Sequence, residues 1–290
     1  MTTSGTTGPV PATSARSEHV APEPAEALAG LLDIPGPAAA DGLPPLWHWI
    51  YLFERRRQAD LGPDGHPTQG VPAPPGPGRL RMFGGGRVTT YAPLRFGEPA
   101  TRTTQLVREV EKTGASGPMT LATVRIGIEQ GGRLAVAEEQ DIVYRPAGAG
   151  APRRPAPTPR PEEPVPEPVA RLEMHVDPVV LFRFSALTYN AHRIHYDAAY
   201  AAAEGYPGLV VHGPLQALLM GECLRRAGAP VIGSTFAYRL VAPTFGEQQL
   251  SVTAAAGDDG WSARVQDGAG RTTATATLRP QPVAVQETSE

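Results

Sequence analysis

The sequence has very little of several residues on which whole classes of function depend. Cys223 is the single cysteine among 290 residues, so an intrachain disulfide and a cysteine-based zinc site are both excluded. Lys112 is the single lysine, which leaves no other lysine for covalent chemistry. No run of 18 apolar residues occurs, so the sequence predicts no membrane-spanning helix. Residues 1–20 also lack the apolar centre of a secretory signal, and we therefore expect a soluble cytoplasmic protein.

The sequence also lacks an excess of basic residues over acidic ones. The chain has 26 Lys and Arg against 29 Asp and Glu, which gives a net charge of −3. Nucleic-acid-binding domains normally carry a basic patch, so we expect no nucleic-acid partner. Gly and Pro are abundant by contrast, at 32 and 33 residues, and their distribution decides whether a packed core can form.

Gly and Pro gather in a few segments. Nine prolines fall within residues 146–168, where no ladder of backbone hydrogen bonds can persist, and this composition predicts an extended linker. A second cluster at Leu61–Gly78 predicts a loop. We therefore expect a mostly disordered tail over 1–42, a first domain over 43–145, the linker, a second domain over 169–280 and a short tail over 281–290.

The two expected domains share a sequence pattern. Ala92–Glu98 and Ala242–Glu247 are similar to each other, and each is followed by three strand-like runs separated by glycine-containing turns. The runs are Thr101–Val110, Met119–Glu129 and Leu134–Tyr144 in the first half, and Gln249–Ala254, Trp261–Asp267 and Thr272–Leu278 in the second. This repetition predicts a duplicated antiparallel fold.

A helix is predicted before the strands of each half. Over Pro214–Arg226, apolar residues recur at helical spacing, with proline in the first turn and Gly228 beyond the end. Leu46–Phe53 predicts a shorter helix in the first half, and Gly84–Gly86 is interpreted as a tight turn before a strand. One helix with an antiparallel sheet in each half is an α+β arrangement.

The most chemically informative stretch is Phe184–Asp197, which we interpret as a structured loop that points polar side chains into a cleft. It contains His192 and His195, and His212 and Gly213 follow just before the predicted helix at Pro214. The free N–H groups at a helix N-terminus stabilise negative charge. A titratable imidazole beside them is the combination that enolate chemistry on a carbonyl requires.

This stretch resembles the hydratase motif of the MaoC-like acyl-thioester hydratases, Asp-x-Asn-Pro-x-His-x-Asp followed by His-Gly-x-Leu. The closing His-x-Asp, here His195–Asp197, and the His-Gly-x-Leu, here His212–Leu215, match the motif, but Asn190, His192 and Arg193 depart from it. These departures resemble a two-domain subfamily of mesaconyl-C4-CoA or itaconyl-CoA hydratases and 3-hydroxyacyl-thioester dehydratases. Its N-terminal domain is similar to the first half here at Leu43–Trp49, Met82–Arg87 and Glu138–Arg145. The resemblance implies a tandem, or double, hot-dog fold in which each half wraps a sheet around a helix.

The resemblance also implies roles for individual residues. His195 would exchange a proton with water, the N–H of Gly213 would stabilise the enolate oxygen, and Asn190 would hold the water. A carboxamide cannot accept a proton as a carboxylate can, so we expect His195 to act as the single base. The first half lacks the motif, and we expect one active site per chain.

Substrate-binding residues are expected around the motif. Arg193 and Arg183 carry guanidinium groups that can bind a carboxylate of the substrate in bidentate fashion, although a CoA phosphate or Asp197 is an equally possible partner of Arg193. Tyr189 and His212 complete the expected set, although for His212 we favour a structural role, in which it caps the helix or bonds to the backbone. No spacing supports a metal site or a dinucleotide site, so we expect no cofactor.

The expected function is the addition of water to an α,β-unsaturated acyl-CoA, with a dicarboxylyl-CoA such as mesaconyl-C4-CoA or itaconyl-CoA as substrate. One alternative is a 3-hydroxyacyl-CoA or acyl-carrier-protein dehydratase. The alternative of another class is a non-catalytic acyl-CoA-binding protein or a thioesterase, for which the late position of Glu222 in its helix is unfavourable. The chain is expected to act as a monomeric double hot-dog or as a homodimer, without a membrane partner.

Overall fold

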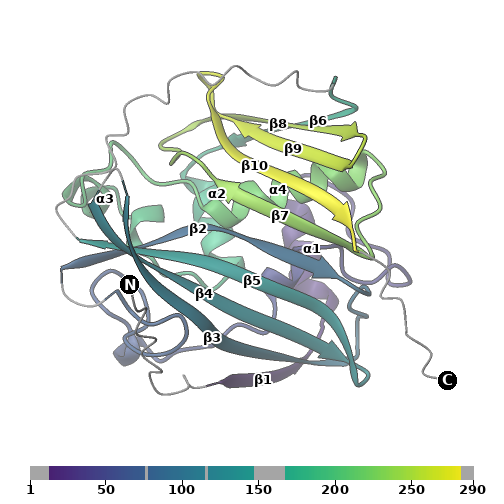
Figure 1. Cartoon of the computed structure of the whole chain (residues 1–290), viewed down its shortest axis with the longest axis horizontal. Coiled ribbons are helices and arrows are strands. Elements are labelled where there is room, and N and C mark those ends of the chain that lie inside the picture. Colours follow the sequence, from purple (N-terminus) through teal and green to yellow (C-terminus); the bar gives the residue numbers. More distant parts are fainter. Residues whose placement is uncertain (1–12, 76–77, 115–116, 147–166, 282–290) are drawn as a thin grey trace, which may run out of the picture.

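One antiparallel sheet runs through the whole molecule and contains strands of both halves (Figure 1). The structure is a computed structural model that describes residues 13–75, 78–114, 117–146 and 167–281. Within these residues the strand order is β1-β3-β4-β5-β2-β7-β10-β9-β8-β6. The strands of the first half are β1 Ser14–His19, β2 Arg79–Thr90, β3 Pro99–Gly114, β4 Gly117–Gln130 and β5 Arg133–Pro146. Those of the second half are β6 Ala170–Val176, β7 Ser234–Leu240, β8 Gln248–Gly257, β9 Gly260–Gln266 and β10 Thr272–Pro280.

The halves join where β2 pairs with β7, in a register that runs from Gly85 opposite Arg239 to Thr90 opposite Ser234. Gly85 has a φ of +147°, and a Cβ built on it would lie 2.4 Å from the carbonyl oxygen of Tyr238. On Gly86, a Cβ would lie 2.4 Å from the carbonyl oxygen of Glu139. Because only glycine avoids these contacts, the two glycines allow β2 to lie between β5 and β7.

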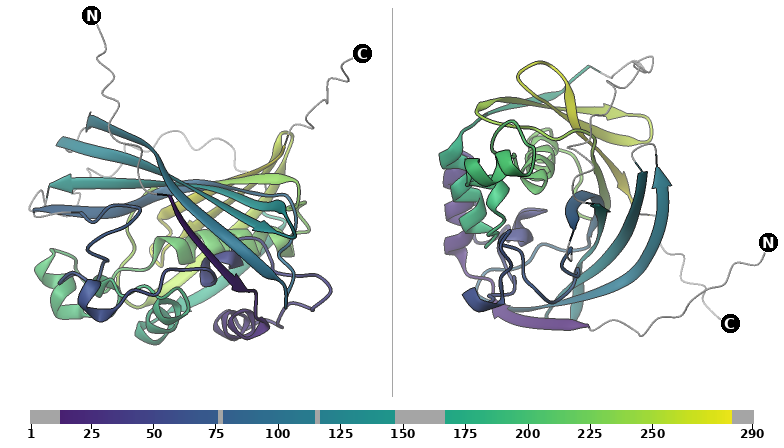
Figure 2. Two further views of the ribbon diagram at one scale, coloured as in Figure 1. Left: turned by 90° about the horizontal axis from the view of Figure 1, so that it is seen from below. Right: turned by 90° about the vertical axis from the view of Figure 1, so that its left-hand side faces the viewer.

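The helices lie on one side of the sheet, which curves around them (Figure 2). The α-helices are α1 Pro22–Leu31, α2 Pro178–Leu187, α3 Ala198–Ala203 and α4 Gly213–Arg226, and the short 3-10 helices are η1 Trp47–Ile50, η2 Gln58–Asp60 and η3 Arg193–His195. Among the described residues, none of these helices has the length and apolarity that a membrane crossing requires.

Helix α4 is the central element of the core. All residues from Leu215 to Leu224 are buried, and the helix packs on β6, β8, β9 and β10. Its Gly221 lies so close to Leu46 of the first half that a Cβ would be 2.6 Å from the Cδ1 of that leucine. The buried apolar residues of both halves form one cluster. The core is therefore continuous across the duplication.

The predicted strands and the helix at Pro214 are found close to their expected positions, and the expected α+β class with a duplicated antiparallel arrangement is confirmed. The expectation of a mostly disordered tail over 1–42 is wrong for residues 14–31, which form β1 and α1. Strand β1 pairs with β3, and Ala25 and Leu28 of α1 are fully buried. Burial of this short apolar stripe against α2 stabilises a segment whose composition alone does not favour order. Most of the expected linker and the C-terminal tail lie outside the described residues.

Three local predictions are also corrected. Gly84–Gly86 is not a turn but the middle of β2, where the register shifts between Phe83 and Gly85. The helix expected over Leu46–Phe53 shortens to the single 3-10 turn η1. Phe184–Leu187 forms the last turn of α2 rather than a loop. The helix begins upstream of the motif, where Asp177 caps it by accepting a hydrogen bond from the N–H of Val180, and it continues into the motif.

The junction between the halves predicts a large loss of stability for Gly85→Ala. The substitution strains a backbone with positive φ and introduces a contact with Tyr238, so the free energy of unfolding should fall by roughly 1–3 kcal/mol. Urea denaturation monitored by circular dichroism measures the change. Gly257→Ala is the matched control, because its Cβ would meet nothing closer than 3.6 Å. Equal stability of the two variants would contradict this account of the junction.

Candidate active site

A cavity of about 670 Å³ lies between the two halves and is lined by the three predicted catalytic residues. The second half contributes Asn190, His192, His195 and Gly213 to its wall. The first half contributes polar residues from η1, the loop before β2, and β2, β3 and β5. These are His48, Trp49, His66, Arg81, Arg102, Glu138, Gln140 and Arg145.

His195 has the geometry of a general base. It ends η3, is 8% exposed, and its Nδ1 lies 2.7 Å from the carbonyl oxygen of Val210. A carbonyl oxygen only accepts hydrogen bonds, so Nδ1 carries the proton and the neutral ring keeps a lone pair on Nε2. Burial lowers the pKa of His195 to about 4. The imidazole is therefore neutral near pH 7 and can accept a proton.

His212 lies behind this imidazole and does not line the cavity. Its ring stacks on His195 with centroids 3.7 Å apart, and its Nε2 lies 2.9 Å from the hydroxyl of Ser185. Burial lowers the pKa of His212 well below the ordinary value. A second charged ring at this distance would be repelled, so His212 supports His195 in its neutral form. Its position favours the structural role over the expected substrate-binding role.

Gly213 begins α4 and lines the same cavity as His195. Its N–H has no acceptor among the described residues, and the next residue, Pro214, has no N–H at all. A Cβ on Gly213 would meet Cδ1 of Leu240, so a larger residue here would displace that side chain. A free N–H at a helix N-terminus can donate to a developing oxyanion.

Asn190 also lines the cavity, with a defined orientation. Its Oδ1 accepts a hydrogen bond from the backbone N–H of His192 at 3.0 Å. Because a backbone N–H can only donate, the side-chain oxygen is fixed and the NH₂ group is left to donate to a water or a substrate. This is consistent with the expected role of holding a water molecule.

The structure does not bring the other three predicted residues into the cavity. Arg193 binds Asp197, with its Nη2 2.7 Å from Oδ2, and stacks over Tyr200. Arg183 is exposed on α2, where its guanidinium lies 3.8 Å from the position of a Cβ on Gly30. Tyr189 is 54% exposed and stacks on Phe53 with ring centroids 5.4 Å apart. For Arg193, the interaction with Asp197 left open by the sequence is the one observed.

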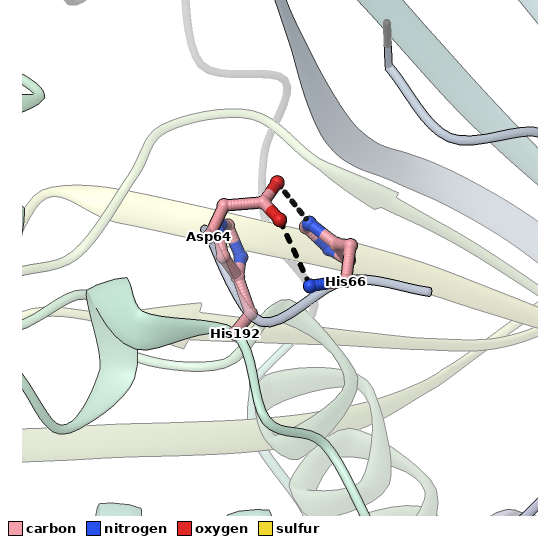
Figure 3. Close-up of side chains that lie close together, drawn as sticks. All are labelled: Asp64, His66 and His192. Carbon is pink, nitrogen blue, oxygen red and sulfur yellow. Dashed lines mark hydrogen bonds and ion pairs between the residues drawn. The ribbon is translucent and has the colours of Figure 1, made fainter. Parts of the chain in front are cut away.

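The expected set omits a loop of the first half that contacts the motif. The carbonyl oxygen of Asp64 accepts the N–H of Arg193 at 2.9 Å, and Gly65 packs so closely on Ala191 that no Cβ would fit. The rings of His66 and His192 are 4.0 Å apart (Figure 3). The proline- and glycine-rich composition of Leu61–Gly78 indicates a loop, but no local signal reveals what it contacts.

Glu138 is a second cavity residue that the expected set omits. It is 1% exposed and accepts hydrogen bonds from Nε2 of His48 at 2.9 Å, Nε1 of Trp49 at 3.0 Å and Nε2 of Gln140 at 2.7 Å. Burial acts to raise its pKa, but the hydrogen bonds from His48 and Gln140 and the charge of Arg102 outweigh it and lower the pKa. The carboxylate is thus ionised and held rigidly. The signal that could have pointed to Glu138 is an acidic residue at an inward-facing position of the strand that became β5.

Asp64, His66 and His192 form the one group, within the described ranges, of three side chains close enough to ligate a metal ion. Their ligand atoms lie within 4.8 Å of one another. Both oxygens of Asp64 already accept hydrogen bonds from His66, one from the backbone N–H and one from Nδ1, each at 2.9 Å. The positive charge of Arg81 also acts on all three side chains. Both oxygens of the Asp64 carboxylate are therefore occupied, and a neighbouring cation opposes the binding of another.

A neutral, fixed imidazole and a free helix N-terminal N–H in one cavity between two hot-dog halves define an acyl-thioester hydro-lyase. The family model for hydroxyacyl-thioester dehydratase type 2 matches residues 46–246. The chain belongs to this family. It is also 48% identical over 223 residues to the mesaconyl-C(4)-CoA hydratase of Chloroflexus aurantiacus, which covers 76% of this chain and 78% of that protein.

Solved structures agree on the fold. A MaoC-like dehydratase from Phytophthora capsici superposes with a TM-score of 0.68 at 15% identity, covering 96% of this chain and 97% of that one. A conserved hypothetical protein from Mycobacterium tuberculosis with a double hot-dog fold gives a TM-score of 0.50 at 16% identity, covering 89% and 86%. The resemblance to the MaoC-like hydratases is confirmed.

The lowered pKa of His195 predicts how activity depends on pH. Only the neutral ring can accept a proton, so a pKa of about 4 keeps the base active well below pH 6.5. We expect kcat/KM, which reports the free enzyme, to stay level from pH 8 to about 5.5 and to fall only below that. Initial rates across this range test it, with circular dichroism at each pH as the control for folding. A loss of activity centred between pH 6 and 7 in folded enzyme would contradict it.

Proposed function

We propose that this protein adds water across the double bond of an α,β-unsaturated acyl-CoA whose acyl chain ends in a free carboxylate, as in mesaconyl-C4-CoA. One observation carries the proposal. The lone pair of His195 and the free N–H of Gly213 border the same cavity, one suited to take a proton and the other to stabilise an oxyanion. The similarity to mesaconyl-C(4)-CoA hydratase supports the choice of acyl group.

The reaction follows from the positions of these groups. Nε2 of His195 takes a proton from a water molecule that the NH₂ of Asn190 holds, and the hydroxide oxygen bonds to the β-carbon. The electron pair of the double bond moves onto the thioester oxygen, where the N–H of Gly213 stabilises the enolate. The imidazolium then returns its proton to the α-carbon. One water molecule is added, His195 ends neutral, and the chain's own groups suffice without a cofactor.

The reverse reaction is the second candidate. The family match to hydroxyacyl-thioester dehydratases favours loss of water from a 3-hydroxyacyl thioester. The same groups serve both directions, since His195 would remove the α-proton and then protonate the departing hydroxyl. Turnover numbers for hydration and for dehydration separate the two candidates. Hydration decreases the enoyl-thioester absorbance and dehydration increases it.

His195→Gln should reduce the rate of hydration of mesaconyl-C4-CoA by about 100-fold to 10 000-fold, because the general base is lost. The measurement is the decrease in enoyl-thioester absorbance under saturating substrate. His175→Gln is the control, since this histidine lies on the surface opposite Glu247 and should leave the rate unchanged. Near-normal activity of His195→Gln would overturn the assignment. Inactivity of the unmodified protein toward both mesaconyl-C4-CoA and crotonyl-CoA would overturn the proposed function.

A further inference from the structure

Arg81 brings a cationic side chain into the cavity next to the histidines. It lies on β2, opposite Tyr144 of β5, and lines the cavity together with His66 and His192. Burial lowers the pKa of His192 to about 2, and the charges of His66, His195 and Arg81 act in the same direction. Arg81 and His192 thus line the same cavity and interact electrostatically, and the ring of His192 lies in T-shaped contact with the ring of His195 at a centroid distance of 5.5 Å.

The guanidinium of Arg81 has no hydrogen-bond acceptor among the residues that the structure describes, although the side chain is half-buried. Asp64 is an acid whose charge acts on it, but both oxygens of that carboxylate bind His66. The ring of His192 likewise makes no hydrogen bond to a described side chain or backbone group. Five N–H donors and one imidazole N–H are thus available at this end of the cavity. A partly desolvated cation with free donors is well suited to an anionic ligand.

Three other arginines line the cavity in different surroundings. Arg102 interacts with Glu138 and Glu54, so its charge is already balanced. Arg239 is exposed on β7. The charge of Arg145 acts on the pKa of Tyr206. Of the four, Arg81 is the one whose charge acts on His66 and His192, beside the base.

In a butenedioyl thioester, the free carboxylate lies close to the carbon that reacts. In such a substrate the carboxylate is attached to the β-carbon, the same atom that receives the hydroxyl group. His195 activates the water that attacks the β-carbon. The carboxylate on that carbon must therefore lie close to His195. Among the residues that line the cavity, His192 contacts His195, and the charge of Arg81 acts on His192, whereas Glu138 is an anion that accepts hydrogen bonds from its own donors.

We propose that Arg81, with the ring N–H of His192 beside it, binds the free carboxylate of the substrate and thereby selects dicarboxylyl thioesters over simple enoyl thioesters. The inference rests on the proposed hydratase function and assigns the carboxylate to a residue of the first half. It replaces Arg193 and Arg183, which the structure holds outside the cavity. Arg81 is a specificity-determining residue here and takes no part in the proton transfers.

The test compares Arg81→Met with two matched variants, Arg239→Met and Arg145→Met, which remove other arginines from the same cavity. Each enzyme is assayed with mesaconyl-C4-CoA and with crotonyl-CoA, which lacks the carboxylate. Arg81→Met should lose about 100-fold in kcat/KM for mesaconyl-C4-CoA, as expected for removal of one partner of a desolvated charge pair. Its kcat/KM for crotonyl-CoA should remain within about threefold. The other two variants should affect both substrates equally.

Binding provides a second readout that does not require turnover. Succinyl-CoA and butyryl-CoA are non-reacting analogues with and without the carboxylate, and calorimetric titration gives their Kd values. Arg81→Met should weaken succinyl-CoA binding alone, and Arg81→Lys, which keeps the charge without the planar fork, should weaken it less. Should Arg81→Met fail to fold, the Kd values of Arg81→Lys and Arg145→Met for succinyl-CoA still test whether Arg81 binds the carboxylate.

The possible failures are distinguishable. If the unmodified protein hydrates neither thioester, the proposed function fails, and the succinyl-CoA titration still tests Arg81. If it hydrates both but Arg81→Met reduces the two activities equally, the proposed function stands and the role of Arg81 is wrong. The role is also wrong if Arg145→Met or Arg239→Met shows the selective loss instead.

Discussion

The backbone hydrogen bonds between β2 and β7 hold the two halves in one sheet, and the site depends on that junction. Gly85 and Gly86 allow three strands to approach at this place, where any side chain would meet a carbonyl oxygen. Because the halves share a sheet, α4 of the second half packs against Leu46 of the first, and one continuous core forms. The cavity lies between the halves, so neither half alone could enclose the residues that line it.

Desolvation sets the chemical state of the site. His195 and His212 are buried and stacked, and His192 and His66 follow along the same wall. Bringing protons to several neighbouring rings in a medium of low polarity is unfavourable, so burial lowers the pKa of each. The carbonyl of Val210 then decides which nitrogen of His195 keeps its lone pair. The neutrality of the base comes from burial and its tautomer from a single backbone contact, and both are properties of the folded chain.

Local patterns were sufficient for the elements with strong periodicity. The amphipathic spacing from Pro214 and the alternating runs after Ala92 and Ala242 correspond to α4 and to six strands of the sheet. Helix α1 was not predicted because its ten residues are stabilised mainly by burial against α2, which no short window of sequence contains. The middle of β2 was misread because its three glycines are typical of a turn, whereas here they serve close strand packing.

For the site, sequence reasoning identified the residues of one local motif. His195, Asn190 and Gly213 lie within 24 positions of one another, and all three line the cavity. The sequence by itself also determined that Arg193 and Asp197, one helical turn apart, are in reach of each other. Only the tertiary structure decided which residues face the motif from the opposite side. His66, Arg81 and Glu138 are separated from His195 by 57 to 129 positions, and their approach follows from the packing of one half on the other. Side chains that meet across a domain junction leave no periodic trace in the sequence, because the contact depends on the path of the whole sheet between them.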